Sequence, residues 1–414
     1  MKISKKISNF LIYGLGQSIN LLSPLIVLPY LIRVCKEEGV GKIGIAFSIC
    51  LILNCLVDYS SYLQGTKAIA IYRKNTQKLS KIISSIYAYK FILLLVILLT
   101  FCLVIIGLPV IKEKKLYLLS LAIVVSQFLN PNWILQGLEN FKLISVLNVL
   151  SKTLYIGLVY VFVQTYEDYV WANFFLGTSG VLVYFIALLY FRKSFHITIN
   201  KQNLKRGIGI LKKDLHICIS EFCLSIYQFV PIIIVGTILG NASAGIYRII
   251  EQIFSVFRTF IFMFFNFSYA SVCDEISRNL ALGIKNWKQY HLANLGIIAL
   301  GVLLVFVLAN DILHYFNVNE TFFSFIVPLL RLALLLPLVL VFSQALRQLL
   351  FSLNMTSIYT KIIYLSSTIN FLVLCLGIKY YGLWGAFISM FLVEILVIIL
   401  YIYHLKTNLK NSVA

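Results

Sequence analysis

Three basic residues lie deep inside apolar segments that are long enough to cross a lipid bilayer. Lys152 and Arg258 fall near the middle of their segments, and Arg331 lies somewhat towards one end. An ionisable group at mid-membrane costs about 2.5–3.5 kcal/mol on insertion scales, so each needs a partner or a wet cavity. Arginine offers bidentate hydrogen bonds to phosphate. These residues therefore predict a site for an anionic substrate, particularly a phosphate.

A purely structural role is the alternative for each cation. Arg258 could instead pair with Glu251 or Glu221 and only lock helices together. Arg248 lies close enough to an interface that a structural role is favoured, although we retain it as a candidate contact. Long side chains near helix ends can reach the interface, and we expect this of Lys90 and Arg33.

Four carboxylates in the apolar segments are candidates for ion coupling, namely Glu221, Asp58, Glu251 and Glu394. A desolvated carboxylate could exchange protons on each transport cycle. A structural ion pair is the alternative for any one of them. We expect at least one of the four to couple to an ion, either H⁺ or Na⁺.

Polar residues in four segments fall on single helical faces, because successive helical residues differ by about 100°. We expect these faces to line one central cavity. They comprise Asn9, Tyr13, Gln17, Asn20 and Pro24; Asn54, Asp58, Ser61 and Gly65; Glu221, Ser225 and Gln228; and Arg248, Glu251, Ser255 and Arg258.

The elements that position these groups follow from the composition. The chain has 414 residues, of which 60% are hydrophobic and 12% charged, with a formal charge of +20. Soluble domains are only about 45–50% apolar, and a soluble protein of this composition would expose too much hydrocarbon. A soluble enzyme, a DNA-binding protein and a disordered basic protein are thereby excluded.

A membrane helix needs about 20 apolar residues, and we predict twelve such helices in an all-α integral membrane protein. They cover residues 10–32, 43–64, 86–108, 116–138, 143–164, 169–191, 215–239, 245–270, 289–309, 322–345, 357–377 and 382–404.

The basic residues predict the orientation of the chain. With the N-terminus in the cytoplasm, 23 of the 35 Lys and Arg residues fall in inside segments and 7 in outside segments. This obeys the positive-inside rule and predicts that both termini are cytoplasmic. Contact with anionic membrane lipid and topology account for the charge, so no nucleic acid partner is expected.

The basic stretch 192–214 divides six predicted helices from six. We predict a lobe over 1–191, a cytoplasmic linker over 192–214 and a second lobe over 215–414. The linker either lies partly as an interfacial helix or, as we favour, serves only to orient the chain. Residues 39–49 and 243–253 resemble each other at equivalent positions, which suggests parallel repeats about an axis along the membrane normal.

Sites for enzymatic chemistry and for cofactors are not evident. The chain has no GxxxxGK[ST] sequence and no long outward loop. Its eight cysteines form no CxxC and its five histidines are scattered, so we expect neither a metal centre nor a disulfide framework. Transport without a cofactor is the favoured class.

Three segments carry a resemblance to a known family. The stretches PNWILQGLENF (131–141), YGLGQ…PLIVLPYLIRV (13–34) and YYGLWGAFISMFLVEI (380–395) resemble bacterial O-antigen and polysaccharide flippases of the multidrug/oligosaccharidyl-lipid/polysaccharide (MOP) exporter superfamily. This resemblance implies a MATE-like fold and export of an undecaprenyl-pyrophosphate-linked oligosaccharide across the bacterial inner membrane. Other polysaccharide-assembly membrane proteins are possible partners.

Amides and an indole complete the candidate substrate contacts. Gln17, Asn20, Gln136 and Trp133 could serve sugar hydroxyls; interhelical hydrogen bonding and interfacial anchoring are their alternatives. Two other functions remain open. A multidrug exporter of the same fold would favour acidic and aromatic cavity residues, and a membrane glycosyltransferase or polymerase would favour a long acidic outward loop.

Overall fold

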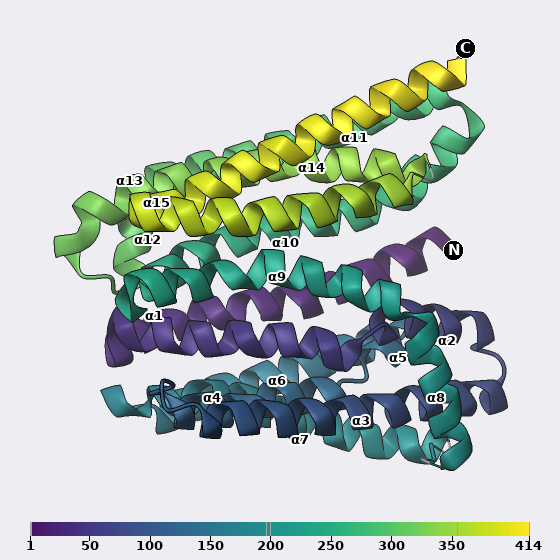
Figure 1. The fold of residues 1–414 in the computed structure, drawn as a ribbon. Coiled ribbons are helices and arrows are strands. Elements are labelled where there is room, and N and C mark those ends of the chain that lie inside the picture. The colour runs from purple at the N-terminus through teal and green to yellow at the C-terminus, as the bar shows by residue number, and fades with distance from the viewer. Residues whose placement is uncertain (1, 196, 199, 354, 414) are drawn as a thin grey trace. The chain divides into compact units, whose positions relative to one another are not determined.

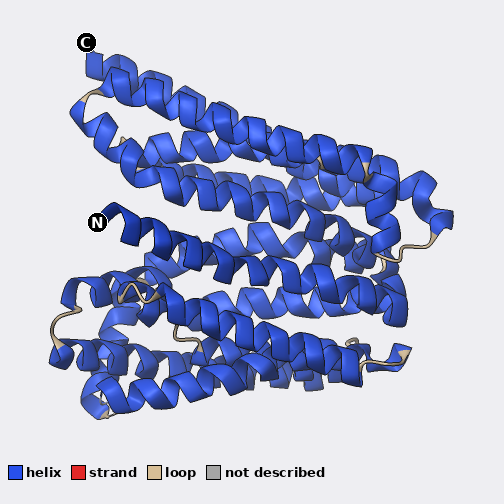
Figure 2. Cartoon of the chain, turned by 180° about the vertical axis from the view of Figure 1, so that it is seen from behind, coloured by secondary structure: helices blue, strands red, loops and turns tan. Residues whose placement is uncertain are grey.

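The computed structural model describes the backbone of residues 2–195, 197–198, 200–353 and 355–413. It describes the side chains of residues 18–407 apart from 196, 199, 267, 270 and 354. Throughout these described residues the regular elements are helices, with no strand (Figure 2). The expected all-α class is confirmed. Helices suit a bilayer because they satisfy their backbone hydrogen bonds internally.

Two compact units make up the chain, residues 1–230 and 231–414, and the division falls inside α9 (Leu215–Leu239). The predicted division on either side of 192–214, and its pseudo-two-fold axis, stay predictions. Unit 1 also contains α1 (Lys2–Asp58), the π-helical turn η1 (Ser61–Gly65), α2 (Thr66–Tyr72), α3 (Thr76–Gly107), α4 (Lys114–Leu129), α5 (Asn132–Gly137), α6 (Phe141–Phe162), η2 (Tyr166–Asp168), α7 (Tyr169–Phe195) and α8 (Lys201–Lys213) (Figure 1). Unit 2 also contains α10 (Asn241–Arg278), α11 (Leu280–Val307), α12 (Ala309–Tyr315), η3 (Glu320–Phe322), α13 (Phe323–Ala333), α14 (Leu335–Ser352) and α15 (Thr356–Val413).

Ten helical segments of the described chain are long and apolar enough to cross a membrane. Two of them, α1 and α15, contain non-helical residues at Lys36 and Gly382. The chain reverses direction at both points, so each of these helices holds two of the predicted apolar stretches (Figure 1). Gly382 has φ +58°, which favours glycine, and a Cβ on Gly385 would lie 1.8 Å from the Gly377 carbonyl oxygen. The count of twelve crossings stays a prediction.

Three predicted segments are interrupted. The expected helix 43–64 is divided between α1 and η1 at Tyr59–Ser60. The expected helix 116–138 is divided into α4 and α5 at Asn130–Pro131, and 322–345 is divided into α13 and α14 near Leu334. Proline lacks a backbone N–H and disfavours helix at the preceding residue, which explains the break at Asn130–Pro131.

Asparagine caps begin several of the helices. The side chain of Asn75 accepts from Lys78 N at 3.0 Å at the start of α3, and Asn140 accepts from Leu143 N at 3.2 Å at the start of α6. Each such cap satisfies a backbone donor that would otherwise be unpaired and contributes about 1 kcal/mol.

Small residues bring α4 and α7 together. A Cβ on Gly177 would lie 2.3 Å from the backbone of Ala122, and one on Gly180 would lie 2.0 Å from Ser126 Oγ. Close approach through glycine is a common way to associate membrane helices, because apolar lipid leaves no hydrophobic drive between them. This contact places serine side chains of both helices beside the middle of α6.

The face of α3 that lies away from the core is apolar and exposed. Leu95, Leu99, Leu103 and Ile106 are 50–63% exposed and recur at helical spacing. Contiguous exposed hydrocarbon of this kind suits contact with lipid tails rather than with water.

Candidate functional site

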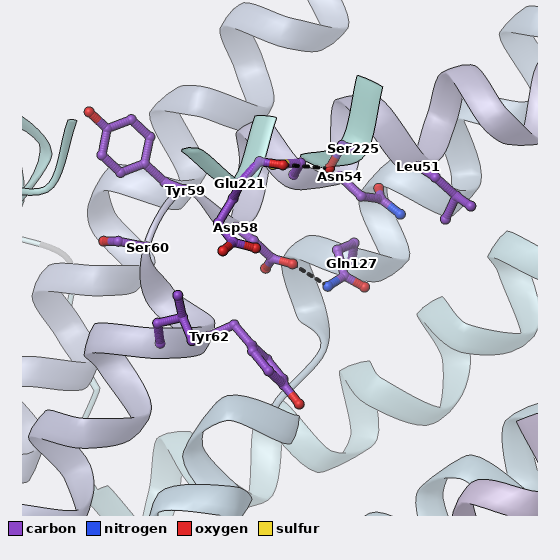
Figure 3. A pocket seen from close by; sticks show the side chains of 11 residues that line it. Leu51, Asn54, Asp58, Tyr59, Ser60, Tyr62, Gln127, Glu221 and Ser225 are labelled. Atoms are coloured by element: carbon purple, nitrogen blue, oxygen red, sulfur yellow. Dashed lines mark hydrogen bonds between the residues drawn. The ribbon is translucent and has the colours of Figure 1, made fainter. Parts of the chain in front are cut away.

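The first of two adjoining cavities in unit 1 is lined by two carboxylates. It has a volume of about 290 Å³, and its walls include Asp58 and Asn54 of α1, Gln127 of α4, and Glu221 and Ser225 of α9 (Figure 3). We call it the carboxylate cavity. Glu221 and Ser225 line this cavity together with Asn54 and Asp58. Gln228, which we expected on the same face as Glu221, is absent from the described lining. That all four faces line one central cavity stays a prediction. The expected Asn54–Gly65 face does not form one continuous helix, because α1 ends at Asp58 and a turn precedes η1.

Asp58 is held by two donors from different helices. Lys90 Nζ of α3 donates to Asp58 Oδ1 at 2.9 Å, and Gln127 Nε2 donates to Asp58 Oδ2. The Lys90 side chain is 0% exposed. Our expectation that Lys90 reaches the interface is therefore wrong, because a buried carboxylate pairs with its ammonium group inside the bundle.

The second cavity contains Lys152. It has a volume of about 170 Å³, and its polar lining includes Lys152 of α6, Ser126 and Asn130, and Tyr184 of α7. We call it the lysine cavity. Leu51, Asn54 and Gln127 line both cavities, so the two cavities adjoin. Gln127 Oε1 accepts from Asn130 Nδ2 at 3.4 Å, which continues the polar chain from Asp58 into the lysine cavity.

A third polar cluster lies along α10 in unit 2. Glu251 accepts hydrogen bonds from both Arg248 and Arg258, and the Arg258 Nη2–Glu251 Oε1 distance is 2.9 Å. The Arg258 guanidinium also lies 5.4 Å from the Phe254 ring centroid. The ion pair weighed above is thus present. Both partners belong to one helix, so the pair does not by itself lock two helices together.

Arg331 and Glu394 are the remaining charged candidates of unit 2. The guanidinium of Arg331, on α13, lies 4.7 Å from the Phe306 ring centroid, and its Nε atom is buried without a hydrogen-bond partner. Glu394, on α15, is half-buried. Their assignment to substrate and ion stays a prediction.

The uncharged candidates do not gather at either cavity of unit 1. Trp133 is 2% exposed and packs with Tyr87 and Ile86 in a hydrophobic cluster, so it is not an interfacial anchor. Asn20 and Gln136 are half-buried. The side chain of Gln17 lies outside the described residues. Trp133, Asn20 and Gln136 are absent from the described linings of the carboxylate and lysine cavities.

Sequence reasoning missed Gln127 and Asn130. Both are polar residues within the apolar stretch 116–138. Their polarity inside an apolar stretch could have identified them as candidate site residues. Gln127 contacts Asp58, which lies 69 residues away in the sequence. Asn130 contacts Gln127, which lies three residues away. Among the described residues, no group of three or more His, Cys, Asp or Glu gathers as a metal site.

The fold defines the class of protein. It matches a solved structure described as the inward-facing conformation of a multidrug resistance MATE family transporter of the MOP superfamily, with a TM-score of 0.72 and 15% identity over 97% of this chain and 99% of that one. The chain is therefore a multi-pass, all-α membrane protein with a MATE-like fold.

Sequence comparison identifies the family. Residues 7–269 match the model described as "Polysaccharide biosynthesis protein", and the chain belongs to this family. Two curated proteins named "Putative O-antigen transporter" are similar. The one from Escherichia coli (strain K12) is 26% identical over 57% of each chain, and the one from Shigella dysenteriae is 27% identical over 56% of this chain and 59% of its own. The matches thus span less than two thirds of these relatives.

Proposed function

We propose that the protein translocates an undecaprenyl-pyrophosphate-linked oligosaccharide, an O-antigen or capsule repeat unit, from the cytoplasmic to the periplasmic leaflet. The family and the names of its relatives support a polysaccharide precursor as cargo. The MATE-like fold supports transport by alternating access. The protein would act in the bacterial inner membrane with both termini cytoplasmic, alongside other polysaccharide-assembly membrane proteins and without a cofactor.

The observation that carries the proposal is the pair of arginines beside one glutamate in the apolar span Asn241–Asn266 of α10. Arg248 and Arg258 both donate to the carboxylate of Glu251, so two guanidinium groups lie together within this span. Cations at this depth are costly. A pyrophosphate would offset that cost, because it accepts bidentate hydrogen bonds from guanidinium groups.

Arg331 is a further cation within an apolar span of unit 2. It forms no ion pair within the described residues, and its Nε donor is unused. We propose that it also contacts the anionic head group during transport, while amides such as Asn20 and Gln136 contact sugar hydroxyls.

Ion coupling is the second part of the proposal. Glu221 and Asp58 line one cavity, where water or a cation could reach them (Figure 3). We assign the exchangeable H⁺ or Na⁺ to Glu221, because it lines a cavity of about 290 Å³ that can admit water or a cation. In proteoliposomes, Glu221→Gln should abolish the response of transport to an imposed ion gradient. The exposed Glu167→Gln is the matched control. A Glu221→Gln protein that still responds as wild type would remove Glu221 from coupling.

A multidrug exporter is the second candidate function. The carboxylate cavity favours it, because Glu221 lines this cavity beside the paired Asp58 and a carboxylate can bind a cationic drug. Drug sensitivity of cells that express the protein separates the two proposals: protection against cationic drugs with unchanged surface polysaccharide would favour the exporter.

Arg258→Ala tests the flippase proposal in a strain that needs the protein for surface polysaccharide. Glu251 keeps Arg248 as its partner in this variant, so the fold should survive. A lost hydrogen bond between charged groups is worth about 1.5–3 kcal/mol, so display should fall roughly ten- to hundred-fold at equal protein level. The control is Arg278→Ala, which removes an exposed arginine from the same helix. Equal display by both variants would exclude Arg258 from substrate binding.

A further inference from the structure

Lys152 is an intramembrane cation near the middle of α6. Within the part of the chain whose side chains are described, no hydrogen bond or ion pair joins it to another residue. Lys90 is likewise an intramembrane lysine of unit 1 but has Asp58 as its partner. A charged ammonium group at mid-membrane is stabilised only by a counter-charge or by water. The cavity beside Lys152 must therefore supply one or the other.

The walls of the lysine cavity are suited to an anion. They include the hydroxyl groups of Ser126 and Tyr184 and the amides of Asn54 and Asn130, all of which can donate hydrogen bonds. No acidic residue occurs in its described lining. Donors and an ammonium group without a carboxylate favour a bound anion over a metal cation.

The volume limits the size of the occupant. The cavity holds about 170 Å³, whereas pockets for drug-sized ligands have about 300–1,000 Å³. A water molecule takes a share of about 30 Å³ in the liquid. The space therefore suits a small inorganic anion with a few waters.

The residues shared with the carboxylate cavity link the two sites. Gln127 donates to Asp58 and accepts from Asn130. The Gln127 amide thus lies between Asp58 and the amide of Asn130, which lines the lysine cavity.

We infer that the lysine cavity binds a small inorganic monoanion of the size of chloride, which serves as the counter-ion of Lys152. The site lies within unit 1 and is independent of the proposed substrate. Bound anion would stabilise the folded protein, because a ligand that binds only the native state raises its stability by mass action.

Thermal unfolding of the full chain in detergent tests the site, with chloride replacing gluconate at constant ionic strength. The Tm of the wild type should rise with chloride and saturate. Lys152→Met should abolish this dependence, whereas Lys142→Met, an exposed lysine on the same helix, should retain it. A wild-type Tm that does not respond to chloride overturns the proposal.

Two further experiments identify which anion binds and where it binds. Inorganic pyrophosphate is titrated in the same way; a Lys152-dependent rise with pyrophosphate but not chloride would assign Lys152 to the substrate site and overturn the proposal. Crystals grown in bromide need no variant that might fail to fold. An anomalous peak beside Lys152 Nζ supports the site, and a cavity without a peak at saturating bromide contradicts it.

Discussion

The ammonium group of Lys90 lies 2.9 Å from Oδ1 of Asp58, and the lysine side chain is completely buried. This ion pair joins α3 to the end of α1 at the carboxylate cavity. Burial of two charges is costly, and their mutual attraction offsets that cost only while both partners remain. The pair therefore fixes the position of Asp58, and Lys90 neutralises its charge at the carboxylate cavity.

Lys90→Met should strongly destabilise the protein. It leaves the Asp58 carboxylate without its cation, for which losses of about 3–5 kcal/mol are typical. The double variant Lys90→Met with Asp58→Asn should recover part of the loss, because no charge is then left unpaired. Thermal unfolding in detergent measures both. Equal Tm values for Lys90→Met and wild type would contradict a structural ion pair.

Alanine substitutions at two glycines of α8 should change the stability of the protein in opposite directions. A Cβ on Gly207 would lie 2.7 Å from the Ser85 carbonyl oxygen, so Gly207→Ala must displace α8 from α3, at a cost of about 1–3 kcal/mol. Gly209 has no neighbour within 4 Å, so Gly209→Ala should gain up to about 1 kcal/mol of helix propensity. The measurements are Tm and proteolysis within 192–214. Stabilisation by both variants would argue against the docked position of α8.

Glu113 should make the stability of the folded protein fall at low pH. Burial alone would raise its pKa, but the hydrogen bonds from Tyr169 at 2.5 Å and from Lys42 at 3.0 Å hold the pKa below the ordinary value. A lowered folded pKa contributes stability that is present above the unfolded value of about 4.3. That stability is lost as the pH falls through the folded pKa. Tm profiles should show this loss in wild type and a smaller one in Glu113→Gln. Identical profiles would exclude a contribution from Glu113.

Cysteine labelling tests the predicted orientation. In a variant without the native cysteines, Lys205→Cys should react with an impermeant thiol reagent only from the cytoplasmic side. Glu167→Cys, beside the end of α6, should react only from outside. Both parent residues are exposed. Labelling of position 167 from the cytoplasmic side alone would overturn the topology.

The all-α fold class was predictable because apolar stretches of membrane-spanning length recur along the chain. Apolar stretches of about 20 residues must form helices in a bilayer, and the structure forms helices over them. Their ends were less predictable. The reversals at Lys36 and Gly382 are too short for composition to reveal, and Pro131 interrupts a stretch that we expected to be continuous.

The conformation of the basic stretch 192–214 needed the structure. We favoured a simple orienting linker, whereas Lys201–Lys213 forms a helix that crosses the long helices of unit 1 at one end (Figure 1). Gly207 packs against α3, and Tyr59 Oη donates to the Leu211 carbonyl at 2.6 Å. The contacts that hold it join residues up to 152 positions apart, which helical periodicity does not encode.

The candidate site was predictable by residue type but not by partner. Helical geometry placed Arg248, Glu251 and Arg258 on one face, and the structure joins them through shared hydrogen bonds. Helical geometry did not predict that Lys90 pairs with Asp58 or that Gln127 donates to the same carboxylate. Those contacts depend on how α1, α3 and α4 pack, and a face angle within one helix carries no information about a neighbouring helix.

Flipping of a fluorescent undecaprenyl-pyrophosphate-linked oligosaccharide in proteoliposomes tests the central claim most directly. A glycosidase added outside reports how fast the head group reaches the outer leaflet. We predict rapid exposure with wild type, the same rate with Arg278→Ala, and a rate about ten- to hundred-fold lower with Arg258→Ala. A wild-type rate no greater than that of protein-free liposomes, under either direction of an imposed ion gradient, would contradict the flippase proposal.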